Sequence, residues 1–308
     1  MSINFFLAEN PLDLNNIRSV LTRLEDTIIF GCIERAQFAY NPKIYQAGAF
    51  QELEELGFHG SLLEWFLKET EAFHGRSSAN VNLLIQRFFN ASAAKARRYT
   101  SPDEYPFSKD LPDPVLKPLD FPKILHPNTV NANDEIFKFY INEIVPKITK
   151  RTTERIAAEK QAKGLDTDYD HDGNYGSSAT LDVEILQAIS KRIHYGAFVA
   201  ETKFVEKPSA FIPHIQNPNP DALDALITKP AVEKALLERL KKKVAFYGQD
   251  LGANGQPVEN PSLRIDPEDI YTLYHDHIIR VTKDVEVEYL MQRLNGYSQE
   301  EIEEMLKN

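Results

Sequence analysis

The amino-acid sequence predicts an all-α fold. Glycine accounts for only 13 of the 308 residues, and charged and apolar residues are mixed along long segments. In these segments the apolar residues recur every three or four positions, which is the period of a helix, and they do not alternate as they would along a strand. No segment has a convincing strand pattern and no internal repeat is present. We therefore expect a bundle of helices without a significant β-sheet.

Two helices are predicted before residue 102. Residues 14–39 form one long helix, for which Asp13 is a suitable N-cap. Residues 62–73 form a shorter amphipathic helix. Prolines then cluster over residues 102–127, which predicts a long irregular connection.

Four long helical patterns follow this connection. The most regular of them, residues 180–204, keeps a continuous apolar side. The charged residues 150–172 indicate a solvated helix end followed by a loop. An Asn-Gly pair at 295–296 is a helix stop, and the capping box at 298–301 starts a short last helix. The other three long patterns span residues 134–150, 231–247 and 269–294.

Composition limits the partners and the compartment. The 46 acidic residues outnumber the 35 basic ones, and a net charge of -11 repels phosphate backbones and anionic lipids, so we expect no nucleic-acid and no membrane partner. The single cysteine, Cys32, excludes an intramolecular disulfide and any multi-cysteine metal site. The N-terminal residues lack a signal-like pattern, and no segment approaches the ~20 apolar residues of a membrane span. A cytoplasmic location is the expectation.

Motifs for metal, nucleophile or nucleotide chemistry are absent or incomplete. Residues 168–179 resemble a calcium-binding EF-hand loop, with Asp168, Asp170 and Asp172 at the first, third and fifth positions. The twelfth position should be a bidentate glutamate and is Ala179, so we interpret the segment as a polar surface loop. The eight histidines show no ligand spacing, and there is no Walker loop, nucleophile elbow or dinucleotide fingerprint. We expect no metal and no cofactor.

What remains is a set of ionisable residues at core-like positions of the predicted helices. Arg192 and Lys203 are 11 residues apart, which is three helical turns, so both would face one groove within ~20° of each other. Thr282 and Glu286 are four apart and share a face of a helix in which valines separate the charges.

A third pair, Arg18 and Glu25, is seven residues apart on the first helix and is aligned in the same way. For any one of these residues a surface salt bridge is the simpler interpretation, since such pairs are common and contribute little to stability. Taken together, however, the set supplies three cations and an unusual carboxylate, with no metal, redox or nucleophile chemistry left for them to perform.

Several blocks of the sequence match one known family in the same order. The four longest blocks span residues 14–39, 176–204, 227–248 and 281–294. Two shorter ones read GSLLEWFL and RRYTSPDEYPF. In these blocks the sequence resembles the chorismate mutases of fungi and, more distantly, of plants. The resemblance covers most of the chain apart from residues 77–96 and the tail after Leu294.

This resemblance implies an elongated all-helical homodimer that rearranges chorismate to prephenate, in phenylalanine and tyrosine biosynthesis, without a cofactor. It also implies one domain over residues 1–308, with residues 77–96 as an atypical insertion and residues 295–308 as a C-terminal extension.

The resemblance further implies the site residues. Arg18 and Arg192 resemble the two arginines that hold the substrate carboxylates, and Lys203 and Glu286 resemble the pair that flanks the ether oxygen. The remaining substrate-binding residues would be Glu233 at the ring hydroxyl, Thr282 beside the pocket, and Lys229, which stands where the family would have asparagine.

Fungal relatives are inhibited by tyrosine and activated by tryptophan at a second site on the dimer interface. A loop that runs into a helix start suits the carboxylate of such an effector, because free N–H groups point at it. Asp266 stands where some relatives have threonine. The residues that resemble this site are Arg97 and Arg98 from one subunit, with Asn174, Gly176, Ser177 and Thr180 from the other.

Two alternatives without catalysis remain. One is a helical dimer that senses an aromatic amino acid, and the other is a structural helical scaffold. A sensor would keep Arg97, Arg98 and Thr180, but it has no need for the four candidate catalytic residues together.

Overall fold

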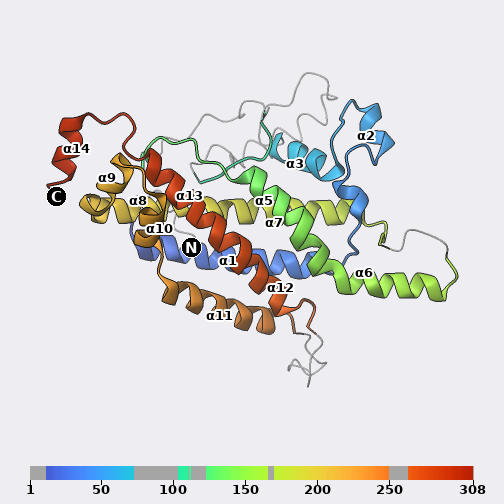
Figure 1. Cartoon of the computed structure of the whole chain (residues 1–308). Helices are drawn as coiled ribbons and strands as arrows, with labels where there is room; N and C mark the ends of the chain where they lie inside the picture. Colours follow the sequence, from blue (N-terminus) through green and yellow to red (C-terminus); the bar gives the residue numbers. More distant parts are fainter. Residues whose placement is uncertain are drawn as a thin grey trace.

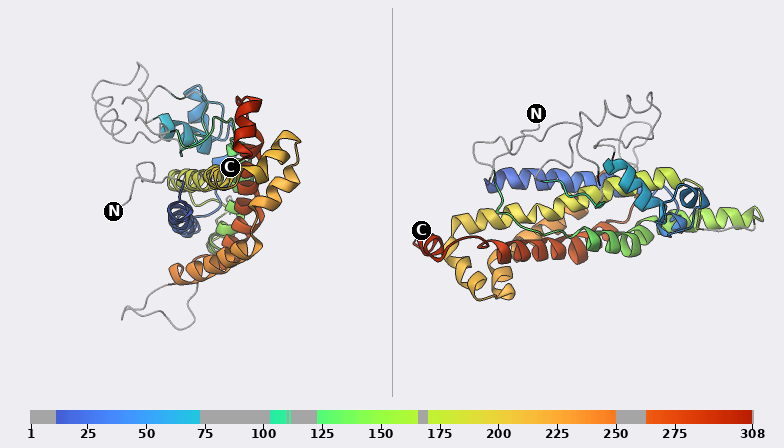
Figure 2. Two further views of the ribbon diagram at one scale, coloured as in Figure 1. Left: turned by 90° about the vertical axis from the view of Figure 1, so that its left-hand side faces the viewer. Right: turned by 90° about the horizontal axis from the view of Figure 1, so that it is seen from above.

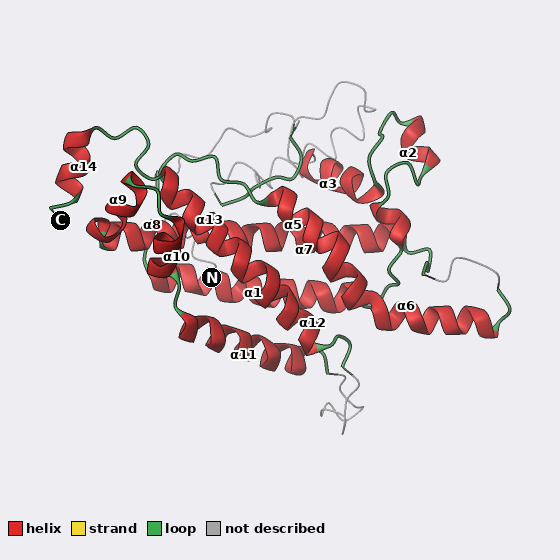
Figure 3. Ribbon diagram, viewed as in Figure 1, coloured by secondary structure: helices red, strands yellow, loops and turns green. Residues whose placement is uncertain are grey.

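The computed structural model of the chain describes residues 12–72, 103–109, 111, 123–165, 170–249 and 263–307. Every regular element within these ranges is a helix and none is a strand, as Figure 3 shows. The predicted all-α class is therefore confirmed for the described part of the chain. The predicted insertion at residues 77–96, and Arg97 and Arg98 after it, lie outside the described residues.

The bundle is elongated and has three layers (Figure 1; Figure 2, right). Helix α1 (Leu14–Arg35) packs along α7 (Tyr175–His194), and α8 (Gly196–Glu206) follows α7 toward one end of the molecule. Helix α13 (Ile279–Gln292) packs against α8 on the side away from α1. The apolar core lies between these layers, because each long helix contributes its buried stripe to it.

Shorter helices cover the ends and edges of this bundle. Among them α9, α10 and α14 gather at one end, whereas α2 and α6 lie at the other (Figure 1). No described helix is both long enough and apolar enough to cross a membrane. The helices not yet given are α2 (Gln51–Glu55), α3 (Leu62–Ala72), α5 (Asn133–Phe139), α6 (Val145–Ala162), α9 (Pro208–Gln216), α10 (Pro220–Ile227), α11 (Pro230–Tyr247), α12 (Pro267–Thr272) and α14 (Gln299–Met305), with a 3-10 turn at Pro42–Tyr45.

The ends of α1 illustrate how local chemistry sets the helix boundaries. Asp13 is the N-cap, as predicted, and its carboxylate accepts the N–H of Asn15 at 2.7 Å. The helix ends at Arg35, short of the predicted residue 39. The Arg35 guanidinium donates to the carbonyls of Ala39 and Tyr40, each at 3.0 Å, and these bonds hold the chain in a turn away from the helix axis.

The helix predicted over residues 180–204 is two helices. Helix α7 begins earlier, at Tyr175, and ends at His194, and α8 starts at Gly196 after a turn at Tyr195. Glycine is a poor helix former. The break falls directly before this glycine, and Arg192 and Lys203 stand on different helices.

The predicted helices 134–150 and 269–294 exist, but each contains a π-helical turn. The turns occupy Tyr140–Ile144, between α5 and α6, and Leu273–Ile278, between α12 and α13. The two turns meet, since His277 Nε2 lies 3.4 Å from Glu143 Oε2, and the His277 ring stacks on Phe139, directly before the first turn, with centroids 4.6 Å apart. A proline crowds the carbonyl four residues before it, and the first wide turn leads directly into Pro146.

Helices α9 and α10 are absent from the sequence-based prediction. Each begins with a proline, Pro208 and Pro220, which is a favoured first helical residue. Asn219 caps α10 by accepting the N–H of Ala222 at 3.1 Å. These start signals were present in the sequence, but each helix is only two or three turns long and shows little periodicity. The predicted capping box of Ser298 is confirmed at the start of α14.

Candidate active site

Arg192 lies in the last turn of α7 with its side chain inside the bundle. The residue is 6% exposed, and its buried Nε has no hydrogen-bond partner within the described residues. A buried charged donor without a partner is unfavourable. The guanidinium is therefore ready to receive an anionic group from a ligand.

Lys203 lies near the end of α8 and is partly buried. Burial lowers the pKa of its ammonium group, and the positive charges of Lys229 and Arg18 lower it further, while Glu286 and Glu233 oppose the shift. The ammonium group also donates to a backbone carbonyl at the end of α10, 2.5 Å away. Charges from α1, α11 and α13 therefore act on one side chain of α8.

Glu286 is a buried carboxyl on α13, with 8% of the residue exposed. Burial raises its pKa to about 7, against the opposing effect of Lys203 and Arg192. Within the described residues it forms neither an ion pair nor a hydrogen bond. The start of α8 covers it closely, since a Cβ placed on Gly196 would lie 3.0 Å from Glu286 Cγ. Near neutral pH a large fraction of this group is a neutral acid that can donate a hydrogen bond.

The remaining candidate residues lie around these three. Thr282 is buried one turn before Glu286 and donates to the carbonyl of Ile278 at 2.6 Å. Glu233, on α11, forms an ion pair with Lys283 of α13 at 2.8 Å. The exposed residues are Lys229, which directly precedes α11, and Arg18 of α1, whose Nη1 donates to Asn15 at 3.4 Å.

The predicted cations and the carboxyl are thus brought together, although not by the predicted geometry. Arg18, Arg192, Lys203 and Glu286 stand on four different helices, α1, α7, α8 and α13. Their charges are linked, because Lys203 responds to Arg18 and Glu286, and Glu286 responds to Arg192.

Glu25 does not belong to this group, although it is aligned with Arg18 in the sequence. Its carboxylate is almost fully buried and pairs with Arg239 at 2.8 Å and Lys243 at 3.1 Å, both on α11. Both carboxylate oxygens are therefore engaged in tying α1 to α11.

Three residues near the carboxyl of Glu286 were not predicted. Gly196 provides the close approach of α8, and Asp224 and Lys283 act on the Glu286 pKa from α10 and α13. Lys283 directly follows Thr282, so its position near the site could have been predicted from the sequence. Asp224 was not, because it lies on α10, which the sequence-based prediction lacks.

The candidate effector residues of α7 lie together at the start of that helix. Asn174 is its N-cap residue, and its N–H donates to Asp172 at 2.8 Å. Thr180 donates to the carbonyl of Gly176 at 2.9 Å. The exposed members of the set are Asn174, Gly176, Ser177 and Thr180.

The acidic loop before α7 has a structural role. Both carboxylate oxygens of Asp172 accept hydrogen bonds, from the N–H groups of Ala39 and Asn174 and from the Asn41 amide, each at 2.8 Å. Burial raises the Asp172 pKa, but these hydrogen bonds outweigh it and leave the pKa lowered. Asp168 lies outside the described residues. Among the described residues no cluster of His, Cys, Asp or Glu could hold a metal ion.

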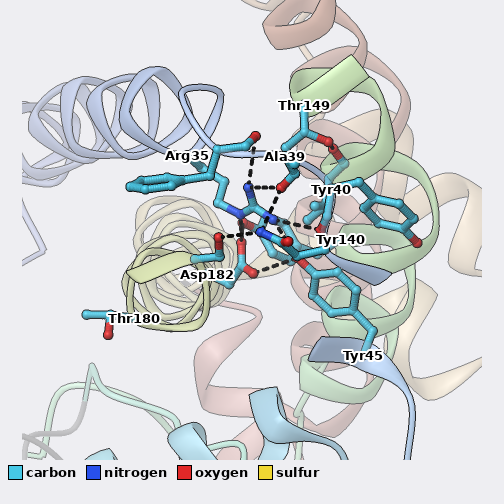
Figure 4. A network of polar contacts seen from close by, with 12 residues as sticks. Arg35, Ala39, Tyr40, Tyr45, Tyr140, Thr149, Thr180 and Asp182 are labelled. Carbon is cyan, nitrogen blue, oxygen red and sulfur yellow. Dashed lines mark hydrogen bonds and ion pairs between the residues drawn. The ribbon is translucent and has the colours of Figure 1, made fainter. Parts of the chain in front are cut away.

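A second buried polar cluster ties α1 to α7 (Figure 4). Arg35 Nε donates to Asp182 at 2.9 Å, and both side chains are fully buried. Asp182 also accepts hydrogen bonds from the hydroxyl groups of Tyr45, at 2.7 Å, and Tyr140, at 2.8 Å. The charges are matched within the cluster, so we regard it as part of the bundle's framework.

Comparisons with known proteins point to one family. A family model described as "Chorismate mutase type II" matches residues 174–287. The chorismate mutase of Trichoderma parareesei is 41% identical over 288 residues, which cover 93% of this chain and 95% of that protein.

Two solved structures are similar over almost the whole chain. The Aro7p chorismate mutase of Candida albicans, in complex with L-Trp, has a TM-score of 0.79 and 37% identity over 98% of this chain and 99% of its own. The protein AtCM1, with tyrosine bound in its allosteric site, has a TM-score of 0.70 and 38% identity over 93% of this chain and 98% of its own.

Proposed function

Because this chain belongs to the chorismate mutase family and rearranges chorismate to prephenate, we propose that Arg18, Arg192, Lys203 and Glu286 bind and rearrange that substrate. The reaction is a pericyclic step within one molecule, so it requires no enzyme nucleophile and no cofactor. The protein has two tasks: to hold the enolpyruvyl arm over the ring, and to stabilise negative charge on the ether oxygen as the C–O bond breaks.

Arg18 and Arg192 perform the first task by binding the two substrate carboxylates. Guanidinium groups suit this role because bidentate pairs fix orientation as well as charge. The buried and unpartnered Nε of Arg192 supports the assignment, since an anionic guest would satisfy it.

Lys203 and Glu286 perform the second task. An ionised carboxylate beside a developing oxyanion would repel it, so Glu286 must act as a neutral donor. The observation that carries the proposal is the burial of Glu286, which raises its pKa to about 7. If each preorganised donor contributes ~3 to 4 kcal/mol, the two together supply about the 8 kcal/mol of a million-fold acceleration.

Glu233, Lys229 and Thr282 complete the site on the side of the ring hydroxyl. Glu233 accepts a hydrogen bond from the ring hydroxyl, and its ion pair with Lys283 holds it in place. Lys229 adds a further positive charge within reach of Lys203, which keeps the anionic substrate favoured over a neutral analogue.

The pH dependence of kcat/KM tests this proposal. Activity requires neutral Glu286, so kcat/KM is expected to fall as the pH rises through about 7. Glu286→Gln is a permanent donor and is expected to flatten that limb, as followed by the loss of chorismate absorbance without metal or nucleotide. Lys241→Met is the control, because Lys241 pairs with Glu268 on an exposed face and its loss should leave the profile unchanged. A wild-type profile in Glu286→Gln would exclude the neutral-donor role.

We further propose a homodimer in which tyrosine inhibits and tryptophan activates the enzyme. The effector would contact the start of α7, and Arg97 and Arg98 of the second subunit would meet its carboxylate. The bound L-Trp and tyrosine of the two related structures support an effector site of this kind. Because α7 also carries Arg192, a shift at its start could reach the substrate. A cytoplasmic location and a single domain over residues 1–308 stay predictions.

A further inference from the structure

A buried ion pair fastens α8 to α13 beyond the candidate catalytic residues. Arg293 donates to both carboxylate oxygens of Glu201, at 2.6 and 3.0 Å, and the residues are 8% and 3% exposed. The hydroxyl of Tyr289, which is fully buried, donates to the same carboxylate at 2.6 Å and accepts the N–H of His126 at 3.0 Å. The guanidinium also lies over the ring of Phe204, 4.5 Å from its centroid.

Stability alone is a weak reason for such a cluster. Removing two charges from water is unfavourable, and well-packed apolar side chains of similar volume are often as stabilising as a buried ion pair. What an apolar contact does not provide is direction. The bidentate ion pair between Arg293 and Glu201, with a third hydrogen bond from Tyr289, has one favourable geometry. It therefore fixes the register of the two helices.

The same helix pair carries the two groups that face the ether oxygen. Arg293 follows Glu286 by seven residues, which is two turns, so both lie on one face of the helix. Glu201 precedes Lys203 by two residues on α8. At the other end of the interface, Gly196 lets α8 approach Thr282 and Glu286 so closely that a Cβ there would lie 3.0 Å from each.

We propose that Glu201, Tyr289 and Arg293 are positioning residues that set the register of α8 against α13 and so hold Lys203 and Glu286 at their working separation. The inference rests on the proposed roles of Lys203 and Glu286. These three residues are not placed at the substrate. They act only through the two helices that carry Lys203 and Glu286.

The arrangement predicts which kinetic constants change. The substrate carboxylates are held from α1 and α7, by Arg18 and Arg192, and neither helix is fastened by this cluster. A fault in the register of α8 therefore lowers kcat and leaves KM almost unchanged. The charges that face Glu286 come from Lys203 on α8, Arg192 on α7, Asp224 on α10 and Lys283 on α13.

Of these four residues, only Lys203 moves with α8. A loosened α8 also exposes the Glu286 carboxyl, which Gly196 covers. Burial is the largest cause of the raised Glu286 pKa, so its partial loss outweighs the weaker attraction of Lys203. The alkaline limb of the pH profile is therefore expected to move to lower pH.

The test compares two tyrosines that make the same bond in different places. Tyr289 and Tyr140 are both fully buried, and each donates to a buried carboxylate, at 2.6 Å to Glu201 and at 2.8 Å to Asp182. Tyr289→Phe is expected to lower kcat about tenfold with KM within about twofold. Its alkaline limb should move down by roughly half a pH unit. Tyr140→Phe should lose a comparable amount of stability, while kcat and the pH of the alkaline limb stay unchanged.

A second variant removes both charges, so that no buried charge is left unpaired. Glu201→Met combined with Arg293→Met is expected to fold, to lower kcat more than Tyr289→Phe does, and to shift the limb in the same direction. Equal kinetics and pH profiles in Tyr289→Phe, Tyr140→Phe and wild type, or a double variant that retains wild-type kcat, would overturn the inference. Lys203→Met, measured alongside, distinguishes failure of the positioning role from failure of the proposed function. Unchanged activity in Lys203→Met would contradict the proposed function itself.

Discussion

Among the described residues, Glu286 differs from buried glutamates such as Glu25 and Glu201 in forming neither an ion pair nor a hydrogen bond. Glu25 is paired with Arg239, and Glu201 with Arg293, so each buried charge is compensated. Glu286 is also buried, but the cations near it, Lys203 and Arg192, act on its pKa without forming an ion pair with it. Burial raises its pKa more than these charges lower it, so the carboxyl tends to hold its proton, which is the state that the proposed chemistry needs.

The raised pKa of Glu286 also predicts how stability depends on pH. A carboxyl with a folded pKa of about 7 and an ordinary value of 4.5 binds a proton in the native state that the unfolded chain releases. Its contribution is fully present below pH 4.5 and is lost as the pH rises through about 7. Glu286→Gln should therefore gain up to about 3 kcal/mol over wild type at pH 8, and much less at pH 5. Urea unfolding at the two pH values measures this, and an equal difference at both would contradict it.

The sequence could not distinguish these glutamates. Arg18 and Glu25 have the spacing of a functional pair, but the partner of Glu25 is Arg239, more than two hundred residues away. The spacing of Thr282 and Glu286 is of the same kind, and here both side chains are buried next to Gly196. Helical spacing tells which face a side chain occupies, whereas its partner depends on which helix packs there.

At the scale of elements, the contact between α8 and α13 is the tightest feature of the site. Glycine at position 196 allows this approach, because a Cβ there would lie only 3.0 Å from Glu286 Cγ and from both the side chain and the backbone carbonyl of Thr282. Backbone cannot move aside as a flexible side chain does. The glycine that follows the break in the predicted helix is therefore the residue that allows α13 to approach.

Gly196→Ala should consequently impair catalysis more than stability explains. We expect kcat to fall at least about tenfold, because Glu286 is pushed from its position by a fraction of an ångström or more. Gly31→Ala is the matched control, since its Cβ would meet only the side chain of Ile185, between α1 and α7. If both variants lose activity in proportion to their thermal stability, the close approach has no special role.

The predicted elements were right where a helix is long and amphipathic. Residues 14–39, 231–247 and 269–294 were recognised because an apolar stripe repeats over several turns. Short helices such as α9 and α10 bury only two or three side chains each, which is too few to establish a period. The π turns could not be recognised from the apolar pattern either, because one additional residue only rotates the apolar stripe around the helix.

For the molecule as a whole, the buried cluster of Figure 4 fastens the two central helices. Asp182→Asn would leave the Arg35 guanidinium without its counter-charge in a fully buried place. We expect a loss of about 3 to 5 kcal/mol in the free energy of unfolding. Asp284→Asn removes an exposed partner of Arg280 and should lose less than about 1 kcal/mol. Similar losses in the two variants, measured by urea unfolding, would rule out the framework role.

Regulation offers a second test at this scale. If tyrosine binds at the start of α7, Thr180→Ala should weaken its inhibition about fivefold through one lost hydrogen bond, with unchanged activity in the absence of tyrosine. Thr27→Ala is the control, because Thr27 makes the same bond to a carbonyl one turn earlier, on α1. Equal inhibition of both variants and wild type would place the effector elsewhere.

The all-helical class and the identity of the family could be predicted from the sequence, because long blocks such as residues 176–204 keep their pattern. The arrangement of the site could not. Arg192 and Lys203 were placed on one helix, and the turn at Tyr195 separates them. The close packing at Gly196 depends on a helix more than eighty residues further along the chain, and such a contact is fixed only by the tertiary fold.

The paired π turns have a consequence for changes in chain length. Each holds one residue more than an ordinary helix, and removing that residue would turn the following segment by about 100°. The two turns lie side by side in the bundle, where Phe139 stacks on His277 and Glu143 approaches His277. Single-residue insertions and deletions among homologues or engineered variants should therefore collect at these two turns, and occur in both helices of the pair or in neither, while α1 and α7 keep a constant length.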